Sequence, residues 1–226
     1  MASKLALAHE RAARVSTLSG GSLLLGLSGK DSFVSLDIAA GHFSRIVCFH
    51  LYTVRGMRCL EAPLEVVCKR YGAELIFVPH WDLARLMKNA VLRPHSMRAS
   101  GLRTMKKADS EHLARKRSGI EWIAYGERLS DCYARRLFWR KLDGIYAQGK
   151  RCTLIPDWLD ADVAGYMTAK KLPSPCTFND IQGRSSGFDL SAPVLAWLRQ
   201  HHPTDFETVL KTFPAAGVQI YEPKED

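Results

Sequence analysis

The chain has 226 residues, 46% of them hydrophobic, and a formal net charge of +9 at pH 7. This length and apolar content predict one α/β domain with a small appendage, and they exclude disorder as the main state. No segment reaches the roughly 20 apolar residues of a membrane span, and residues 1–14 carry charges where a secretory signal is apolar. We therefore expect a cytoplasmic protein whose basic charge favours phosphorylated or polyanionic partners.

Apolar runs of strand length alternate with helical patterns along the chain. The expected strands are Ser22–Leu27, Arg45–His50, Ala73–Pro79, Glu121–Gly126 and Cys152–Ile155. The expected helices are Ser32–Ala40, Leu60–Tyr71, Ala161–Lys171 with Asp160 as its N-cap, Ala192–His201 and Thr204–Phe213. This alternation implies βαβ units and a doubly wound, five-stranded, mostly parallel sheet.

The same patterns divide the chain. We expect residues 1–171 to form the α/β domain, with a basic insertion at 93–117. Residues 172–226 are expected to form a Pro/Gly-rich lid, Leu172–Gly187, and a C-terminal helical extension. The six cysteines are dispersed, with no Cys-x-x-Cys pair and no metal-like Cys/His spacing, so neither a disulfide framework nor a zinc ribbon is expected.

A short polar turn follows the first expected strand and opens a helix. Strand, small-residue turn and helix together aim backbone N–H groups and the positive end of a helix dipole at an anion. Gly29 allows close approach of a phosphate, Lys30 supplies a positive charge, and the hydroxyls of Ser28 and Ser32 supply further donors. The alternative is a Ser/Gly turn that only caps an ordinary helix.

This turn resembles the Ser-Gly-Gly-Lys-Asp-Ser signature of the PP-loop superfamily, which includes the N-type ATP pyrophosphatases and the phosphoadenosine-phosphosulfate reductase family. Gly29–Ser32 match the last four residues, while Ser28 replaces the first glycine or one glycine has been deleted. A Walker A loop is excluded because its Gly-x-x-x-x-Gly-Lys spacing is absent. The resemblance implies an adenine nucleotide alpha hydrolase-like fold that binds ATP or a related adenine nucleotide on this loop.

A second turn follows the fourth expected strand. It is similar to the Gly-x-Arg-x-x-(Glu/Asp)-Ser-x-x-Arg turn of the reductase branch, with Cys132 in place of the serine. The resemblance implies that Gly126 allows close approach of the nucleotide and that Arg128 and Arg135 contact phosphate or substrate oxyanions. The alternative is a solvated helix start in which Asp131 pairs with Arg135.

A third segment, Leu154–Tyr166, resembles the proline, tryptophan, aspartate and tyrosine block that follows the fifth strand of that family, and Leu172-Pro173 matches its Leu-Pro turn. The chain departs from the reductases at its end, because Cys176 is the last cysteine and no C-terminal cysteine segment exists. Thiol reduction of sulfate is therefore disfavoured, and no iron–sulfur cluster is expected.

The end of the second expected strand also departs from the family. His50 stands near the place where relatives often have an Asp-Thr-Gly-like turn. We expect this histidine either to orient a ribose or phosphate or simply to be hydrogen-bonded at the strand end.

Superfamily members with intact loops split ATP between the α- and β-phosphates, so the resemblance implies that an acceptor oxygen is adenylated and then displaced by sulfur or nitrogen. Backbone donors, Lys30 and Mg²⁺ are expected to stabilise the leaving charge. Asp31 is a candidate metal ligand or only a helix cap. Cys176 is a candidate nucleophile or sulfur carrier, or a free structural thiol.

The basic insertion holds eight Lys/Arg residues against two acidic ones, a net +6 of the total +9. It is expected to bind nucleic acid, to hold a 3′-phosphate of the nucleotide, or to form a solvated helical face. We predict an adenylating transferase or sulfurtransferase acting on nucleic acid or a nucleotide, with a sulfur-donor or other partner protein and no membrane. The alternatives are a reductase-like enzyme for an adenylyl sulfate and a non-catalytic nucleotide-binding partner protein.

Overall fold

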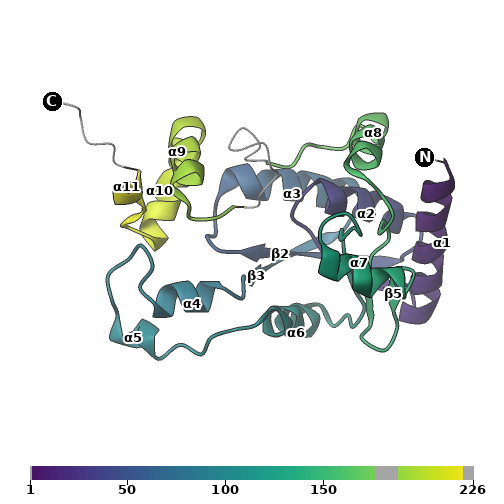
Figure 1. Cartoon of the computed structure of the whole chain (residues 1–226), viewed down its shortest axis with the longest axis horizontal. Helices are drawn as coiled ribbons and strands as arrows, with labels where there is room; N and C mark the ends of the chain where they lie inside the picture. The colour runs from purple at the N-terminus through teal and green to yellow at the C-terminus, as the bar shows by residue number, and fades with distance from the viewer. Residues whose placement is uncertain (1, 177–187, 221–226) are drawn as a thin grey trace. The chain divides into compact units, whose positions relative to one another are not determined.

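The computed structural model describes residues 2–176 and 188–220 (Figure 1). The chain divides into two compact units. The first contains Met1–His50, Pro63–Val78 and His112–Pro175, and the second contains Leu51–Ala62, Pro79–Glu111 and Cys176–Asp226. The second unit thus combines the C-terminal helices with two segments that lie within residues 1–171.

A six-stranded sheet has the strand order β3-β2-β1-β4-β6-β5. Its strands are β1 (Ser22–Gly26), β2 (Arg45–Tyr52), β3 (Glu74–Pro79), β4 (Ile123–Tyr125), β5 (Ile145–Tyr146) and β6 (Arg151–Cys152). β1 pairs in parallel with β2 and β4, β4 pairs in parallel with β6, and β5 pairs antiparallel with β6. The predicted fold class is confirmed, and the short strand β5 adds an antiparallel edge to the five strands expected.

Helices of the first unit are α1 (Ala2–Ser19), α2 (Lys30–Ala40), α7 (Tyr133–Arg140) and α8 (Asp160–Lys170), while α3 (Arg58–Arg70) and α6 (Lys107–Ser118) each begin in the second unit and end in the first. α2 and α8 lie above the strands in Figure 1 and α6 lies below them, so the sheet is covered on both faces. This arrangement explains why the strand sequences are continuously apolar.

The core of the first unit lies between β1 and α2. Phe33 and Ile38 of α2 and Leu23 and Leu25 of β1 are all 0% exposed. α1 adds Val15, also 0% exposed, to this core. No expected helix covered the α1 sequence, since its apolar positions are mostly alanines interrupted by charged residues.

The start of α8 corrects one prediction. The helix begins at Asp160 with Leu159 as its N-cap, and Asp162 Oδ2 accepts the backbone N–H of Leu159 at 2.8 Å. The prediction that Asp160 caps this helix is therefore wrong, because Asp162 makes the capping contact. The carboxylate of Asp160 is left to interact elsewhere.

The second unit has its own core. Met57, Leu195, Leu198, Val209 and Phe213 are all 0% exposed within it. Its helices are α4 (Leu83–Lys88), α5 (Met97–Ser100), α9 (Ala192–His201), α10 (Pro203–Thr212) and α11 (Ala216–Gln219).

The helical pair expected near the C-terminus is present as α9 and α10. Of the expected lid, residues 177–187 lie outside the described residues. Among the helices that the structure describes, none combines the length and the apolar character needed to cross a bilayer.

Candidate functional site

The turns after β1 and β4 meet at the carboxyl end of the sheet. The chain runs from β1 outward to β2 and β3 and then returns to β4 on the other side of β1, which makes the β1–β4 boundary the point where the strand order reverses. Ligands of open α/β sheets bind at this boundary. The two turns that the sequence singled out are therefore brought together by the topology.

Gly126 packs directly on the first turn of α2. A Cβ atom at Gly126 would lie 2.6 Å from both the carbonyl carbon of Asp31 and the backbone nitrogen of Ser32. Real Cβ atoms do not come so close to backbone atoms, so this contact requires glycine. Gly126 thus approaches the loop itself, and the close approach of a nucleotide to this glycine stays a prediction.

The loop is organised by the Ser32 hydroxyl. Ser32 Oγ accepts the backbone N–H groups of Ser28 at 3.0 Å and Gly29 at 3.1 Å, and it donates to Gly29 O at 2.7 Å. A Cβ atom at Gly29 would meet nothing within 4 Å among the described residues, so the outside of the turn is open. The first N–H groups of α2, at Lys30 and Asp31, have no acceptor within their helix. They are suited to bind an anion.

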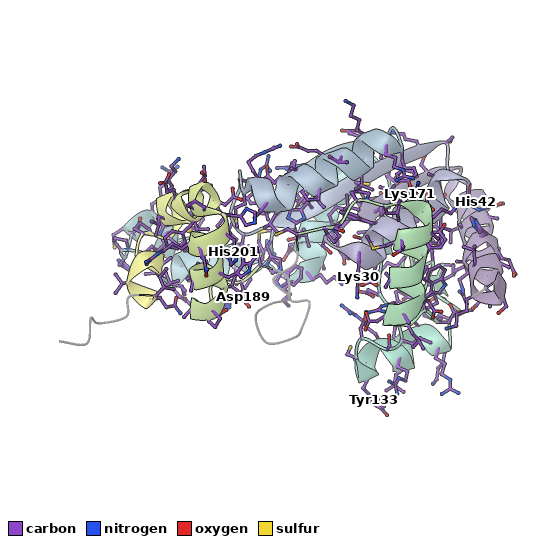
Figure 2. All side chains as sticks on the ribbon, turned by 90° about the horizontal axis from the view of Figure 1, so that it is seen from above. Lys30, His42, Tyr133, Lys171, Asp189 and His201 are labelled. Carbon is purple, nitrogen blue, oxygen red and sulfur yellow. The ribbon has the colours of Figure 1, made fainter. Side chains whose placement is uncertain are left out.

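Two cationic side chains converge on one carboxylate oxygen. Lys30 Nζ lies 2.6 Å from Asp160 Oδ1, and Arg128 Nη2 lies 3.1 Å from the same atom (Figure 2 labels Lys30). The hydrogen bond from Lys30 and the charge of Arg128 hold the pKa of Asp160 below its usual value. The Asp160 side chain is 73% exposed, which makes it replaceable by another anionic oxygen.

Arg128 is the buried centre of this cluster. The residue is 6% exposed, and its Nη2 and Nε atoms each lie 3.2 Å from a carboxylate oxygen, of Asp131 and Asp31 respectively. The Asp31 contact is an ion pair without the alignment of a hydrogen bond. Among the described residues, none accepts a hydrogen bond from Arg128 Nη1. A buried donor without an acceptor is costly, so this atom suits the oxygen of a bound anion.

Asp31 points its carboxylate into the same cluster. Burial raises the pKa of Asp31, against the opposing charges of Arg128 and Lys30. Asp31 Oδ1 is buried and has no hydrogen-bond donor among the described residues. Gly29 occupies the N-cap position and Ser32 makes the reciprocal contact, so Asp31 does not cap the helix through a hydrogen bond. Carboxylate oxygens of this kind are ligands that Mg²⁺ accepts.

Arg135 is engaged with acidic neighbours. Its Nη1 lies 2.9 Å from Asp131 Oδ2, and its Nε lies 3.7 Å from Glu127 Oε1. This is the i,i+4 pair of the alternative interpretation of the second turn. Cys132, in the N-cap position of α7, is exposed and makes no capping hydrogen bond.

His50 is hydrogen-bonded at the strand end. Its Nδ1 lies 2.9 Å from Leu27 O, and because a carbonyl oxygen only accepts, Nδ1 carries the proton. The histidine thus binds the residue that leads from β1 into the loop.

The sequence did not predict that two residues, Asp160 and Asp131, belong to the site. Asp160 was assigned to a helix cap and Asp131 to a surface pair. Asp160 lies in the segment after the fifth expected strand, four residues after Pro156. This position was the only feature of the sequence that could have indicated its place in the site. Cys176 belongs to the second unit, where the neighbouring thiol of Cys59 lowers the pKa of its own thiol.

A scan against protein-family models gives no match, and a search of curated proteins gives none. Among solved structures, the chain is similar to a U34-tRNA thiolase from Methanococcus maripaludis, described with its 4Fe-4S cluster. The identity is 16%, the TM-score 0.44, and the match covers 96% of this chain and 80% of that one. It is also similar to a phosphoadenylyl-sulfate reductase from Candida auris in a phosphate complex, with 13% identity, a TM-score of 0.49 and coverage of 80% and 87%. The chain itself has an α/β fold with a mostly parallel sheet and a polar loop between β1 and α2.

Proposed function

We propose that the chain binds ATP or a related adenine nucleotide at the junction of the two turns and cleaves it between the α- and β-phosphates. The observation that carries this proposal is the convergence of Lys30 Nζ and Arg128 Nη2 on one carboxylate oxygen beside the N-terminus of α2. A phosphate oxygen that replaced Asp160 Oδ1 would receive the same two donors. It would also lie near the unpartnered Nη1 of Arg128.

The charge balance of the cluster supports the binding of a nucleotide together with a metal cation. Among the described residues, the carboxylates of Asp31, Asp131 and Asp160 are paired with three cationic side chains, those of Lys30, Arg128 and Arg135, so the cluster has no excess of positive charge. A polyphosphate alone would add more negative charge than these groups offset. Bound Mg²⁺ would neutralise part of the phosphate charge, and Asp31 Oδ1, which is buried without a donor, is its candidate ligand.

The reaction proposed is transfer of AMP. An acceptor oxygen attacks the α-phosphorus and loses its proton, the bond from that phosphorus to the bridging oxygen breaks, and pyrophosphate leaves. Lys30 and the first N–H groups of α2 are positioned to stabilise the charge that develops on the leaving group. A sulfur or nitrogen nucleophile then forms a bond to the acceptor carbon, the bond from that carbon to the adenylated oxygen breaks, and AMP leaves with the oxygen.

Nucleic acid is the acceptor class that the charge distribution favours. Within the segment 93–117, Arg98, Arg103 and Lys106 are exposed in the second unit. Arg115 and Arg117 instead donate to backbone carbonyls of Glu121 and Phe77. Replacement of Arg98, Arg103 and Lys106 by glutamate should weaken nucleic-acid binding and reduce its salt dependence, and it should leave ATP binding unchanged.

The decisive experiment incubates the protein with labelled ATP and Mg²⁺ in the presence of tRNA, DNA or nucleosides, and separates AMP from ADP. AMP and pyrophosphate should form, with stimulation by the right acceptor. ADP as the product would contradict attack at the α-phosphorus. Tight binding of ATP without turnover under any acceptor would instead identify a non-catalytic nucleotide-binding protein.

A further inference from the structure

Three potential metal ligands from distant parts of the sequence meet in the second unit. One ligand atom each from Cys59, His202 and Asp205 lies within 4.8 Å of the other two. Cys59 is in the first turn of α3, His202 joins α9 to α10, and Asp205 is in the first turn of α10. All three belong to the second unit, so their convergence does not depend on the first.

A fourth candidate ligand lies next to the first. Cys59 and Cys176 are neighbours, since each thiol influences the pKa of the other, and both side chains are partly buried against the core of the second unit. The group whose ligand atoms all lie within 4.8 Å of one another contains one thiol, one imidazole and one carboxylate, and the thiol of Cys176 lies beside that of Cys59.

A structural role explains part of this cluster. The Asp205 carboxylate accepts the backbone N–H groups of Arg58 and Cys59, each at 2.7 Å, and so caps the start of α3. This capping accounts for a carboxylate that is only 4% exposed. It does not account for the two thiols and the imidazole beside it.

The capping contacts are compatible with metal binding. A carboxylate has about four acceptor positions, and two backbone N–H groups leave the others available. Carboxylates that bind metals are commonly held in place by such hydrogen bonds. The ring of His202 lies beside that of Trp197, with ring centroids 5.2 Å apart.

The distances also permit a metal ion. A tetrahedral zinc ion with bonds of about 2.0–2.3 Å holds its ligand atoms about 3.3–3.8 Å apart. The ligand atoms of Cys59, His202 and Asp205 are within 4.8 Å of one another. Side-chain rotations that move these atoms by about 1 Å would therefore bring them to the spacing of zinc ligands. Sulfur, nitrogen and oxygen ligands together favour zinc over magnesium or calcium, which prefer oxygen alone.

We propose that the second unit binds one zinc ion through Cys59, His202 and Asp205, with Cys176 as the fourth ligand. The ion would join the start of α3 to the α9–α10 junction and to the segment that contains Cys176. Because zinc binds thiolates, Cys59 and Cys176 each release a proton when the ion binds. This assignment gives Cys176 a ligand role in place of the nucleophile or sulfur-carrier role predicted from the sequence.

The test uses the full chain under a reductant that prevents a disulfide between Cys59 and Cys176. Zn²⁺ should bind with one equivalent per chain and raise the melting temperature, since a ligand that binds the folded state stabilises it. Co²⁺ at the same site should give the absorption band of a thiolate–cobalt bond. Absence of that band in the wild-type protein would overturn the proposal without any variant.

Matched variants identify the ligands. Cys59→Ser, Cys176→Ser and His202→Gln should each weaken zinc binding at least tenfold. His201→Gln should leave it unchanged, because His201 is exposed on α9 and its Nδ1 lies 2.9 Å from Trp197 O (Figure 2). Equal zinc affinity in the His201 and His202 variants would exclude His202, and unchanged affinity in Cys176→Ser would exclude the four-ligand site. The adenylation assay is scored separately, so either proposal can fail alone.

Discussion

Lys30 Nζ donates to Asp160 Oδ1 at 2.6 Å, across 130 residues of sequence. The pair joins the first turn of α2 to the first turn of α8, and Arg128 binds the same oxygen. An acidic side chain therefore occupies the position that the proposed function gives to a phosphate oxygen. The arrangement has consequences that can be measured.

Lys30→Ala should abolish AMP formation and weaken ATP binding. A hydrogen bond to a charged group contributes about 1.5–3 kcal/mol, so the loss of affinity should be roughly 10- to 150-fold. Thermal stability should change little, because partly exposed ion pairs contribute at most about 1 kcal/mol. Lys69→Ala, which removes an exposed lysine from α3, is the control for net charge, and equal ATP affinity in both variants would exclude the loop as the phosphate site.

Asp160→Asn should bind ATP more tightly than the wild-type chain. The variant removes a carboxylate that competes for Lys30 and Arg128, and a gain of up to about fivefold corresponds to one exposed ion pair. Calorimetric titration with Mg-ATP measures the change. Weaker binding would mean that Asp160 takes part in holding the nucleotide or its metal ion.

Asp162→Asn is the matched control for that variant. Asp162 Oδ2 accepts the Leu159 N–H and pairs with Lys4 Nζ at 2.6 Å, away from Lys30. Asparagine keeps an oxygen that can accept the Leu159 N–H, so the variant should lose at most about 1 kcal/mol of unfolding free energy, through the ion pair with Lys4. Its ATP affinity should match that of the wild-type chain.

Two glycine variants separate folding from binding. Gly126→Ala places a Cβ atom 2.6 Å from the backbone of Asp31 and Ser32, so it should destabilise the protein by about 1–3 kcal/mol and disturb the loop. Gly29→Ala meets nothing within 4 Å among the described residues, and its φ of −153° suits any residue. It should fold normally yet bind ATP weakly, because its methyl group stands where a phosphate approaches. Chemical denaturation and titration with ATP give the two quantities.

The buried carboxyl of Asp31 predicts a pH dependence. Its pKa in the folded protein is raised above 3.8 because burial disfavours the charged form more than Arg128 and Lys30 favour it. The wild-type protein is therefore destabilised by this group above the folded-state pKa, and the effect disappears as the pH falls below 3.8. Asp31→Asn should be more stable than wild type at neutral pH, with a difference that shrinks on acidification. A difference that grows on acidification would reverse the sign of the effect.

Local patterns in the sequence were enough to predict the α/β fold and most of its elements. Continuous apolar runs predicted the strands β1 to β4, and they are clearest in the central strands β1 and β4, because a strand covered on both faces has no polar side. Strand β5 was missed, since two residues are too short for a periodic signal. α1 was missed because, over the part of this helix whose side chains are described, the fully buried apolar residues are only two alanines and one valine.

The candidate site was likewise only partly predictable from the sequence. The sequence by itself determined that Ser28–Ser32 form a polar loop between a strand and a helix, because turn chemistry and helix starts depend on neighbouring residues. Only the tertiary structure decided that Gly126 packs on this loop and that Lys30 and Arg128 share Asp160. These contacts join residues far apart in the chain, and no local pattern contains them. The Cys59, His202 and Asp205 cluster has the same origin, since long-range packing of helices, not ligand spacing, brings its members together.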